Sequence, residues 1–273
     1  MLIALTVIFL IMFITAIIYI FLIMPRVSDR ALMDILTTDY AHRGFHSQRY
    51  PENSLPAFSA AISRGYGIEL DVRLTCDGQV VVFHDTSLKR MCGIDKKISE
   101  MSAIELKRTH LRDTRYTIPT LPNVLALVDG RVPLLIEIKD TEHSDKLCRA
   151  VSVLLDTYGG AFAIQSFDPR VLGWFKRYRP RFARGQLVTK LKTVSGKKHP
   201  RLTATALSGM LTNFISRPDF ISVNAGHTRA LSVRVCHLLF KCRALVWTVR
   251  DQKLYTNTHK RGMLTIFEGF VPD

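Results

Sequence analysis

The chain has 273 residues, of which 47% are apolar and 22% are charged. This composition is ordinary for a folded domain and excludes both a largely disordered chain and a membrane protein with many spans. The length accommodates one barrel-sized domain of roughly 200 to 250 residues, or two small ones. The formal net charge of +15 favours a polyanionic partner, either nucleic acid or an anionic lipid surface.

Residues 1–25 are predicted to form a transmembrane anchor. Residues 2–24 carry no charged side chain, and a helix of this length crosses a hydrocarbon core of about 30 Å. A cleaved signal peptide would have a basic start and a small-residue cleavage site, and neither pattern is evident. Arg26 and Arg30 follow the apolar run, so the positive-inside bias favours a cytoplasmic C-terminal domain on a single-pass protein.

Residues 26–38 are predicted to be a linker, and residues 39–273 a single domain. From residue 39 onward, short apolar runs alternate with stretches of helical apolar spacing, which indicates a parallel sheet. The number of repeats is right for a TIM-type (β/α)8 barrel. The predicted strands are Tyr40–His42, Gly67–Val72, Gln79–His84, Val132–Ile138, Ala161–Gln165, Arg184–Leu187, Phe220–Val223, Ala244–Val249 and Met263–Phe267.

The connection between Gly67–Val72 and Gln79–His84 breaks this alternation. It is only a few residues long and contains the turn-forming pair Asp77-Gly78. So short a link cannot join parallel neighbours, so we expect an antiparallel hairpin. The hairpin brings His84 opposite Asp71 or Glu69, depending on the turn.

Carboxylates recur in two of the predicted strands. Glu69 and Asp71 are two residues apart, so both project from one face of their strand. A divalent cation between them would relieve their repulsion, and oxygen ligands favour Mg²⁺ or Ca²⁺ over zinc. The pair also fits the exposed polar face of an edge strand. Glu137 and Lys139 end a later apolar strand, where they fit either a salt bridge or a third metal carboxylate beside a phosphate contact.

Two histidines follow apolar runs at predicted strand ends. His42 precedes Arg43, and His84 precedes Asp85. An imidazole titrates near neutrality, so it exchanges the proton that an attacking or departing oxygen needs. A single histidine at a strand end is more often structural, whereas two of them with three carboxylates indicate a site. The Arg43 guanidinium suits the oxygens of a phosphate.

These motifs resemble those of the glycerophosphodiester phosphodiesterase family in residue type and spacing. The resemblance extends over nearly all of the chain after the predicted anchor. It rests on His42-Arg43-Gly44, Pro51-Glu52-Asn53-Ser54, Glu69-Leu70-Asp71, Thr75, Asp77-Gly78, His84-Asp85, Leu88, Ile118-Pro119-Thr120-Leu121, Glu137-Ile138-Lys139, Gln165-Ser166-Phe167 and Val246-Trp247-Thr248-Val249.

The resemblance implies a TIM barrel that hydrolyses glycerophosphodiesters to glycerol 3-phosphate and an alcohol with a divalent cation. The attack is expected to come first from the glycerol hydroxyl, through a cyclic phosphate. By the match of motifs, the metal ligands are Glu69, Asp71 and Glu137, the catalytic histidines are His42 and His84, and the substrate contacts are Arg43, Lys139 and Trp247, with Glu52 and Asn53 in support.

The sequence departs from the family pattern in two places. The family commonly ends its last strand with Asp followed shortly by Pro, whereas this chain has Glu268 and then Pro272. The region from Thr86 to Pro119, where the family carries its cap insertion, is short. We therefore expect a barrel mouth open enough for bulky lipid head groups.

A strongly basic stretch lies late in the chain, since no acidic residue occurs between Asp168 and Asp219. With an anchor in the same chain, we expect its partner to be anionic membrane lipid. No nucleic acid is expected, because no zinc finger or single-strand binding motif accompanies the charge. A merely solubilising basic face is the alternative. The stretch contains Lys176, Arg177, Arg179, Arg181, Arg184, Lys190, Lys192, Lys197, Lys198 and Arg201.

The leading hypothesis is a membrane-bound phosphodiesterase that acts on glycerophosphodiesters or lysophospholipids. Lysophospholipase D-type hydrolysis is one alternative, and an inactive barrel that binds anionic lipid is another. A phosphatidylinositol-type phospholipase C on a related barrel would instead release a diacylglycerol.

Overall fold

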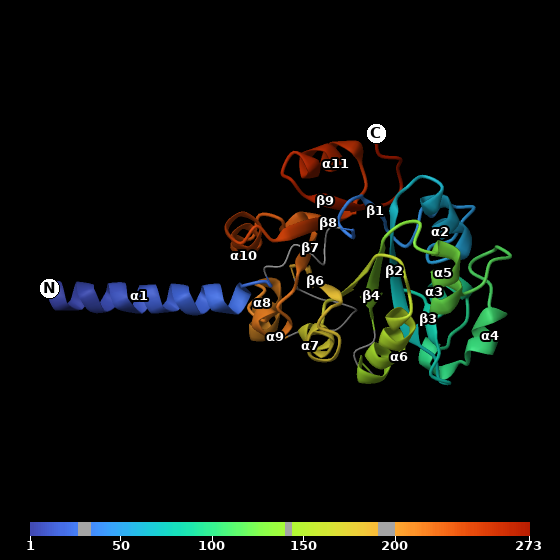
Figure 1. Cartoon of the computed structure of the whole chain (residues 1–273), viewed down its shortest axis with the longest axis horizontal. Helices are drawn as coiled ribbons and strands as arrows, with labels where there is room; N and C mark the ends of the chain where they lie inside the picture. Colours follow the sequence, from blue (N-terminus) through green and yellow to red (C-terminus); the bar gives the residue numbers. More distant parts are fainter. Residues whose placement is uncertain (27–33, 140–143, 191–199) are drawn as a thin grey trace.

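The computed structural model describes residues 1–26, 34–139, 144–190 and 200–273 (Figure 1). Within these residues eight parallel strands form one sheet, in which β1 pairs with both β2 and β9 and so closes a barrel. The predicted (β/α)8 barrel is confirmed. Its strands are β1 (Tyr40–Ala41), β2 (Gly67–Leu74), β4 (Leu134–Ile138), β5 (Phe162–Ser166), β6 (Ala183–Val188), β7 (Phe220–Asn224), β8 (Arg243–Val249) and β9 (Leu264–Phe267).

The ninth strand, β3 (Val80–Val82), pairs with β2 antiparallel outside the barrel. The predicted hairpin is therefore confirmed, but its register differs from the expectation. Val72 lies opposite Val82, and the Phe83 N–H donates to the Asp71 carbonyl. The turn thus sets Phe83 rather than His84 opposite Asp71, and His84 follows one residue later.

Helices connect most of the barrel strands, and several begin at a side-chain cap. The Ser54 hydroxyl accepts from the Ala57 N–H at the start of the first of them, and Thr120, Asp168 and Asp251 cap three others in the same way. The helices after β1 are α2 (Leu55–Ile62), α5 (Leu121–Val128), α6 (Ser144–Asp156), α7 (Pro169–Tyr178), α8 (Arg201–Ser208), α9 (Asn213–Ser216), α10 (Leu231–Arg234), continued by η4 (Val235–Leu239), and α11 (Gln252–His259).

The alternation of side chains along the strands divides the barrel interior into two layers. In β4, Leu134, Ile136 and Ile138 join the core beneath the helices, while Leu135 belongs to a separate cluster inside the barrel. Glu137 has the same parity as Leu135, so it faces inward one step nearer the carboxyl ends of the strands. Apolar side chains therefore fill the amino end of the barrel and polar ones its carboxyl end.

The segment between β3 and α5 forms a small unit beside the barrel. It contains α3 (Lys89–Cys92), η2 (Ile98–Glu100) and α4 (Ala103–Lys107). This is the short cap insertion expected from the sequence. A buried apolar cluster of its own holds it together, made of Val81, Phe83, Leu88, Met91, Ile98, Met101, Leu106, Leu111 and Ile118.

Helix α1 (Leu2–Ile23) projects from the barrel as a single rod (Figure 1). It is long and apolar enough to cross a membrane, although a signal sequence has the same character. In its most apolar stretch of 18 residues, 6% of the residues are buried. Only its last turn enters the barrel core, where Ile23 is buried. The predicted linker at 26–38 falls largely on residues 27–33, which lie outside the described residues, and the predicted domain boundaries stay predictions.

The basic stretch is less uniform than the sequence suggested. Arg184 is not on the surface, because it lies in β6 and is buried against Asp219, to which its backbone N–H donates at 3.0 Å while its Nη1 lies 3.8 Å from the same oxygen. Arg179 pairs with Asp156 of α6 at 2.7 Å. Lys192, Lys197 and Lys198 lie outside the described residues.

Candidate active site

Three carboxylates meet inside the carboxyl end of the barrel. Glu69 and Asp71 come from β2, and Glu137 comes from β4 next to it, where Asp71 and Glu137 are direct register partners. One oxygen of each lies within 4.8 Å of the others, and all three side chains are buried. Two neighbouring parallel strands thus place the predicted metal-binding set on one inner face.

Burial and mutual repulsion affect these carboxylates unequally. Burial raises the pKa of Glu69, and the charges of Asp71 and Glu137 raise it further. Burial likewise raises the pKa of Glu137. The pKa of Asp71 is lowered, because Lys139 and other nearby cations outweigh its burial. Ionising all three carboxylates together is therefore unfavourable unless a further cation joins them.

Lys139, directly after β4, bridges two of the carboxylates. Its Nζ lies 3.2 Å from Asp71 Oδ1 and 2.7 Å from Glu137 Oε1. Burial opposes the charge of this ammonium, but the two carboxylates keep its pKa above the ordinary value. Lys139, which the sequence predicted to contact phosphate, thus lies against two of the three carboxylates that were predicted to bind a metal.

The donor set fits a hard divalent cation. Three buried carboxylate oxygens converge, and Gln165 of β5 donates from Nε2 to Glu69 Oε1 at 3.2 Å. Among the described residues, Gln165 Oε1 is one of few buried side-chain oxygens without a hydrogen-bond partner. An all-oxygen site of this kind suits Mg²⁺ or Ca²⁺.

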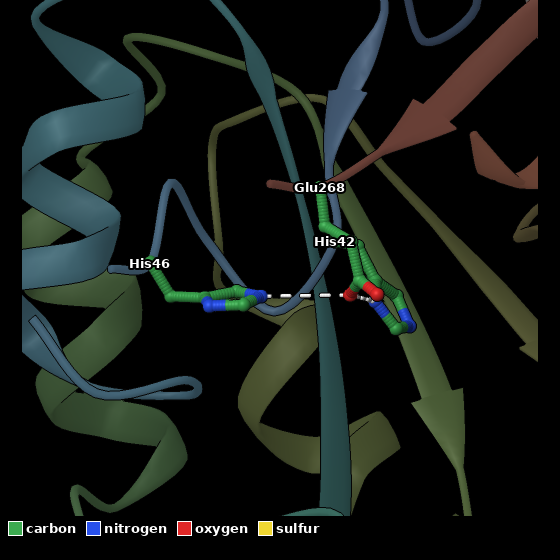
Figure 2. Close-up of side chains that lie close together, drawn as sticks. All are labelled: His42, His46 and Glu268. Carbon is green, nitrogen blue, oxygen red and sulfur yellow. Dashed lines mark hydrogen bonds and ion pairs between the residues drawn. The ribbon is translucent and has the colours of Figure 1, made fainter. Parts of the chain in front are cut away.

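His42 lies where β1 meets the end of β9, and its partner is Glu268. His42 Nδ1 is hydrogen-bonded to Glu268 Oε2, and His46 Nε2 lies 3.5 Å from the same oxygen (Figure 2). Arg250 holds the other oxygen, with Nε donating to Oε1 at 2.7 Å. Burial lowers the pKa of His42, and the pKa of Glu268 is lowered because hydrogen bonds from the two histidines outweigh its burial.

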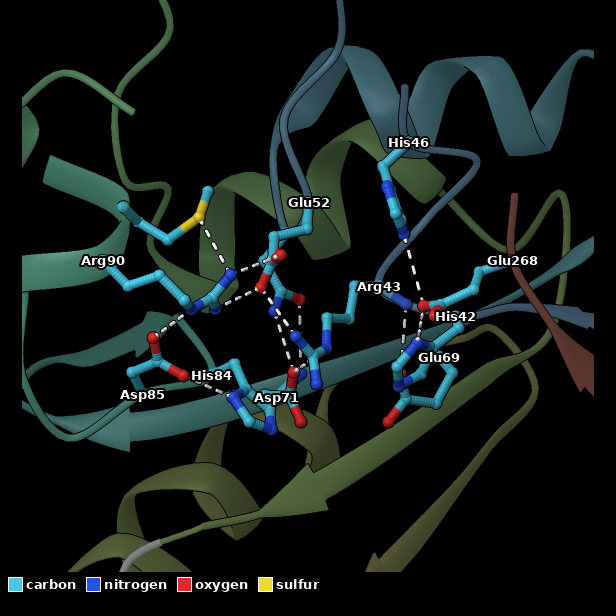
Figure 3. A network of polar contacts seen from close by, with 12 residues as sticks. His42, Arg43, His46, Glu52, Glu69, Asp71, His84, Asp85, Arg90 and Glu268 are labelled. Carbon is cyan, nitrogen blue, oxygen red and sulfur yellow. Dashed lines mark hydrogen bonds and ion pairs between the residues drawn. The ribbon is translucent and has the colours of Figure 1, made fainter. Parts of the chain in front are cut away.

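His84 has a matching arrangement on the other side of the carboxylates (Figure 3). Its Nδ1 lies 2.6 Å from Asp85 Oδ1, and Arg90 Nε donates to the second oxygen of Asp85 at 2.5 Å. Arg73 Nε and Nη2 donate to the His84 carbonyl at 2.9 and 2.7 Å. In both histidines, therefore, a carboxylate occupies Nδ1 and leaves Nε2 for other chemistry.

Arg43 connects the two halves of the site. Its Nη1 donates to Glu52 Oε1 at 2.7 Å, and its Nε lies 3.4 Å from Asp71 Oδ2. Its backbone N–H donates to Glu69 Oε2 at 3.1 Å, and the Arg43 backbone has the left-handed conformation, with φ of 56°. Asn53 donates from Nδ2 to Asp71 Oδ2 at 2.8 Å, so the predicted supporting motif contacts a metal-binding candidate directly.

Trp247, the remaining predicted substrate contact, lies near the carboxyl end of β8. Its indole N–H donates to the Ser222 carbonyl at 2.9 Å, and its ring packs edge-on against Phe167 with centroids 5.6 Å apart. These contacts of Trp247 are thus structural. They fix the position of its ring near the carboxyl end of β8.

Sequence reasoning did not assign Glu268, Asp85 or Arg90 to the site. The rule that found Glu137 and Lys139, that polar residues at carboxyl ends of barrel strands gather, also applies to Glu268 after β9. Asp85 was noted only as a neighbour of His84. No signal in the sequence marks Arg90, because its partners are set by how the insertion packs.

A closed barrel of parallel strands with these side chains at its carboxyl end defines a TIM-barrel protein with a carboxylate-centred site. Residues 42–271 match the model of the glycerophosphoryl diester phosphodiesterase family, and the chain belongs to this family.

Curated relatives match over part of their length. A glycerophosphodiester phosphodiesterase of Bacillus altitudinis is 40% identical over 111 residues, which are 38% of this chain and 45% of that protein. A lysophospholipase D of Mus musculus is 31% identical over 145 residues, 48% of this chain and 44% of that protein. The chain thus spans about half the length of the curated relatives it matches.

Solved structures share the fold over most of the chain. An Oleispira antarctica phosphodiesterase in complex with the product sn-glycerol-3-phosphate superposes with a TM-score of 0.70 at 23% identity, covering 85% of this chain and 93% of the other. A glycerophosphodiester phosphodiesterase from Thermotoga maritima has a TM-score of 0.64 at 28% identity, covering 85% and 94%.

Proposed function

We propose that the protein hydrolyses glycerophosphodiesters to glycerol 3-phosphate and an alcohol, with a divalent cation, while α1 holds it in a membrane. The observation that carries the proposal is the arrangement of two carboxylate-paired imidazoles on either side of one buried carboxylate cluster (Figure 3). Family membership supports the same reaction.

The first requirement is positive charge that binds the anionic phosphate. Glu69, Asp71 and Glu137 would hold Mg²⁺ or Ca²⁺, which supplies positive charge for the phosphate oxygens. Lys139 and Arg43 are part of the same cluster and add two fixed cations that bind and orient the anionic group. Arg43 keeps its orientation because Glu52 holds one of its terminal nitrogens.

Proton transfer is the task of the two histidines. One imidazole takes the proton of the attacking glycerol hydroxyl as its oxygen bonds to phosphorus, and the other gives a proton to the departing alcohol oxygen as its bond to phosphorus breaks. Water then opens the resulting cyclic phosphate with the proton roles reversed. Glu268 and Asp85 fix the two rings so that Nε2 faces the reaction.

Lysophospholipids are a second candidate substrate class, and a cavity favours them. A largely apolar pocket of about 270 Å³ lies beside the His42 end of the site, with His46 and Glu268 in its wall. Phe45, Phe267 and Val271 supply apolar lining that suits an alkyl chain. The similarity to a lysophospholipase D supports this substrate class as well.

Product analysis tests the proposal. The full chain, in detergent micelles, is incubated with Mg²⁺ and either glycerophosphocholine or lysophosphatidylcholine, and products are identified by mass spectrometry. We expect glycerol 3-phosphate with choline from the first and lysophosphatidic acid with choline from the second. We expect His42→Ala to lower turnover at least about 10²-fold, whereas His110→Ala, at an exposed histidine of the insertion, should leave it unchanged.

Other products or none would identify a different function. Release of diacylglycerol from phosphatidylinositol would indicate a phospholipase C. Binding to anionic vesicles without turnover of any diester would indicate an inactive lipid-binding barrel. A Val271→Trp variant, which fills the apolar pocket, should raise KM for lysophosphatidylcholine while leaving glycerophosphocholine turnover unchanged, and equal effects on both would exclude the pocket as an acyl site.

A further inference from the structure

The last turn of α1 is fixed to the barrel by polar contacts. Asn213 Nδ2 donates to the Ile23 carbonyl at 2.9 Å, and Arg217 Nη1 donates to the carbonyls of Phe21 and Met24 at 3.0 and 2.9 Å. Arg217 also lies over the Phe21 ring, with 4.6 Å between its guanidinium carbon and the ring centroid. These side chains satisfy carbonyls that a helix end leaves free, so α1 leaves the barrel in a defined direction.

Helix α10 and its continuation η4 lie beside the end of α1. Tyr19, one turn before Ile23, lies beside Ser232 of α10, and Cys236 Sγ of η4 donates to the Ile23 carbonyl at 3.4 Å. Figure 1 shows α10 next to the point where α1 emerges from the barrel. One face of α10 and η4 thus packs on α1.

The outer face of α10 and η4 carries exposed leucines. Leu231, Leu238 and Leu239, here termed the leucine patch, are 66%, 56% and 64% exposed. Ser232, Val233 and Cys236, which lie between them, are buried, so the three leucines are on the side of this segment that faces away from the core. Isolated exposed leucines need no explanation, but three on one short segment, next to an exposed apolar helix, add to the apolar surface at that end of the molecule.

Positive charge surrounds the leucine patch. Arg234 is exposed between its leucines, and Arg229 and Lys241 are exposed at its two ends. Between Asp168 and Asp251 the sequence has a single acidic residue, Asp219, and it is buried. Apolar side chains mixed with arginine and lysine are the pattern of a helix that lies in a membrane interface.

We propose that the leucine patch inserts into the interface of the same bilayer that α1 crosses, with Arg229, Arg234 and Lys241 on anionic head groups. The proposal rests on the assignment of α1 as a membrane span and is independent of the reaction. It follows from position, because Ser232 and Cys236 of the same segment contact the last turns of α1, where that helix enters the barrel. Two contacts then fix the orientation of the barrel on the membrane.

Fluorescence quenching by brominated lipid tests this contact. Leu238→Trp is introduced into the full chain, which is reconstituted into vesicles of phosphatidylcholine and phosphatidylglycerol with or without dibrominated acyl chains. Ile104→Trp, at a 67% exposed position of α4 in the insertion, is the matched control. In each variant the new indole adds emission to the background of Trp174 and Trp247. We expect brominated lipid to remove most of the added emission in Leu238→Trp and to leave the added emission in Ile104→Trp unchanged.

The outcomes separate this proposal from the enzymatic one. Quenching in Leu238→Trp alone supports the membrane contact, whatever the vesicles hydrolyse. Equal quenching in both variants, or in neither, overturns it, as does a chain that does not float with the vesicles. A blue-shifted but unquenched indole in Leu238→Trp also overturns it, because a second copy of the chain would then cover the patch. Glycerophosphocholine turnover in the same samples tests the reaction by itself.

Discussion

His42 and Glu268 stand 226 positions apart in the chain, yet their side chains are hydrogen-bonded where the first and last barrel strands meet. The His42 backbone N–H also donates to the Phe267 carbonyl at 2.9 Å. The contacts that close the barrel therefore also orient the His42 imidazole. A carboxylate at this position holds the proton on Nδ1 and leaves Nε2 basic.

Replacing Glu268 should impair turnover more than binding. Glu268→Gln keeps the size of the side chain but removes the charge that orients His42, so we expect kcat to fall about 10²-fold with KM little changed. Steady-state kinetics on glycerophosphocholine measures both. In a double-mutant cycle, His42→Ala with Glu268→Gln should be no slower than His42→Ala alone. Additive losses would show that Glu268 acts independently of His42.

Removal of divalent cations should abolish activity. Chelation leaves three buried carboxylates without the cation that would join them to Lys139 and Arg43, and addition of Mg²⁺ or Ca²⁺ should restore turnover. The melting temperature should rise with cation concentration, since binding to the folded state stabilises it. Glu137→Gln should weaken both responses, whereas Asp95→Asn, at a carboxylate 82% exposed, should not. Full activity after exhaustive chelation would refute the metal site.

Glu52 should make stability depend on acid. Although burial raises its pKa, hydrogen bonds and charges from Arg90 and Arg43 lower it from 4.5 to about 2. The ionised carboxylate thus contributes about 3 kcal/mol to the free energy of unfolding above pH 4.5. This contribution is lost progressively as the pH falls towards 2. Thermal melting of the wild type and of Glu52→Gln should differ at pH 6 and converge near pH 2. Asp113→Asn, at an exposed position, should follow the wild type throughout, and a constant offset for Glu52→Gln would contradict the linkage.

Gly44 should tolerate no side chain. Its φ is +81°, and an added Cβ would lie 2.8 Å from the Phe58 ring and 2.9 Å from the Ala57 backbone. Gly93 has a similar φ of +71° but open space around it, so Gly93→Ala should cost only about 1 kcal/mol. Gly44→Ala should cost at least about 2 kcal/mol and displace Arg43, with loss of turnover. Chemical denaturation compares the two, and equal costs would show that backbone strain alone matters.

The sequence allowed prediction of the inner face of the barrel because strand alternation is a local property. Glu69 and Asp71 must share a face, and adjacent parallel strands bring Glu137 beside them. The hairpin at Asp77-Gly78 was equally local, but its register was misjudged by one residue because the turn geometry sets it. The roles of the individual site residues stay predictions until kinetics tests them.

The sequence could not predict side-chain partners that depend on tertiary packing. Arg184 carries the same charge as its neighbours in the basic stretch, yet strand β6 buries it against Asp219. Arg90 reaches Glu52 and Asp85 only because the insertion folds over the barrel. Likewise, nothing in the residues of α1 indicated that Asn213 and Arg217 would donate hydrogen bonds to the carbonyls at its end.

The position where α1 joins the barrel determines which ends of the strands lie near this helix. Arg26 donates its backbone N–H to the Pro218 carbonyl and its side chain to the Pro180 carbonyl, and these prolines precede β7 and β6. Helix α1 is thus attached at the amino ends of the strands, whereas the three carboxylates lie at their carboxyl ends. Because its contacts are with residues outside the carboxylate site, we expect replacement of α1 by a different apolar helix before Arg26 to leave that site unchanged.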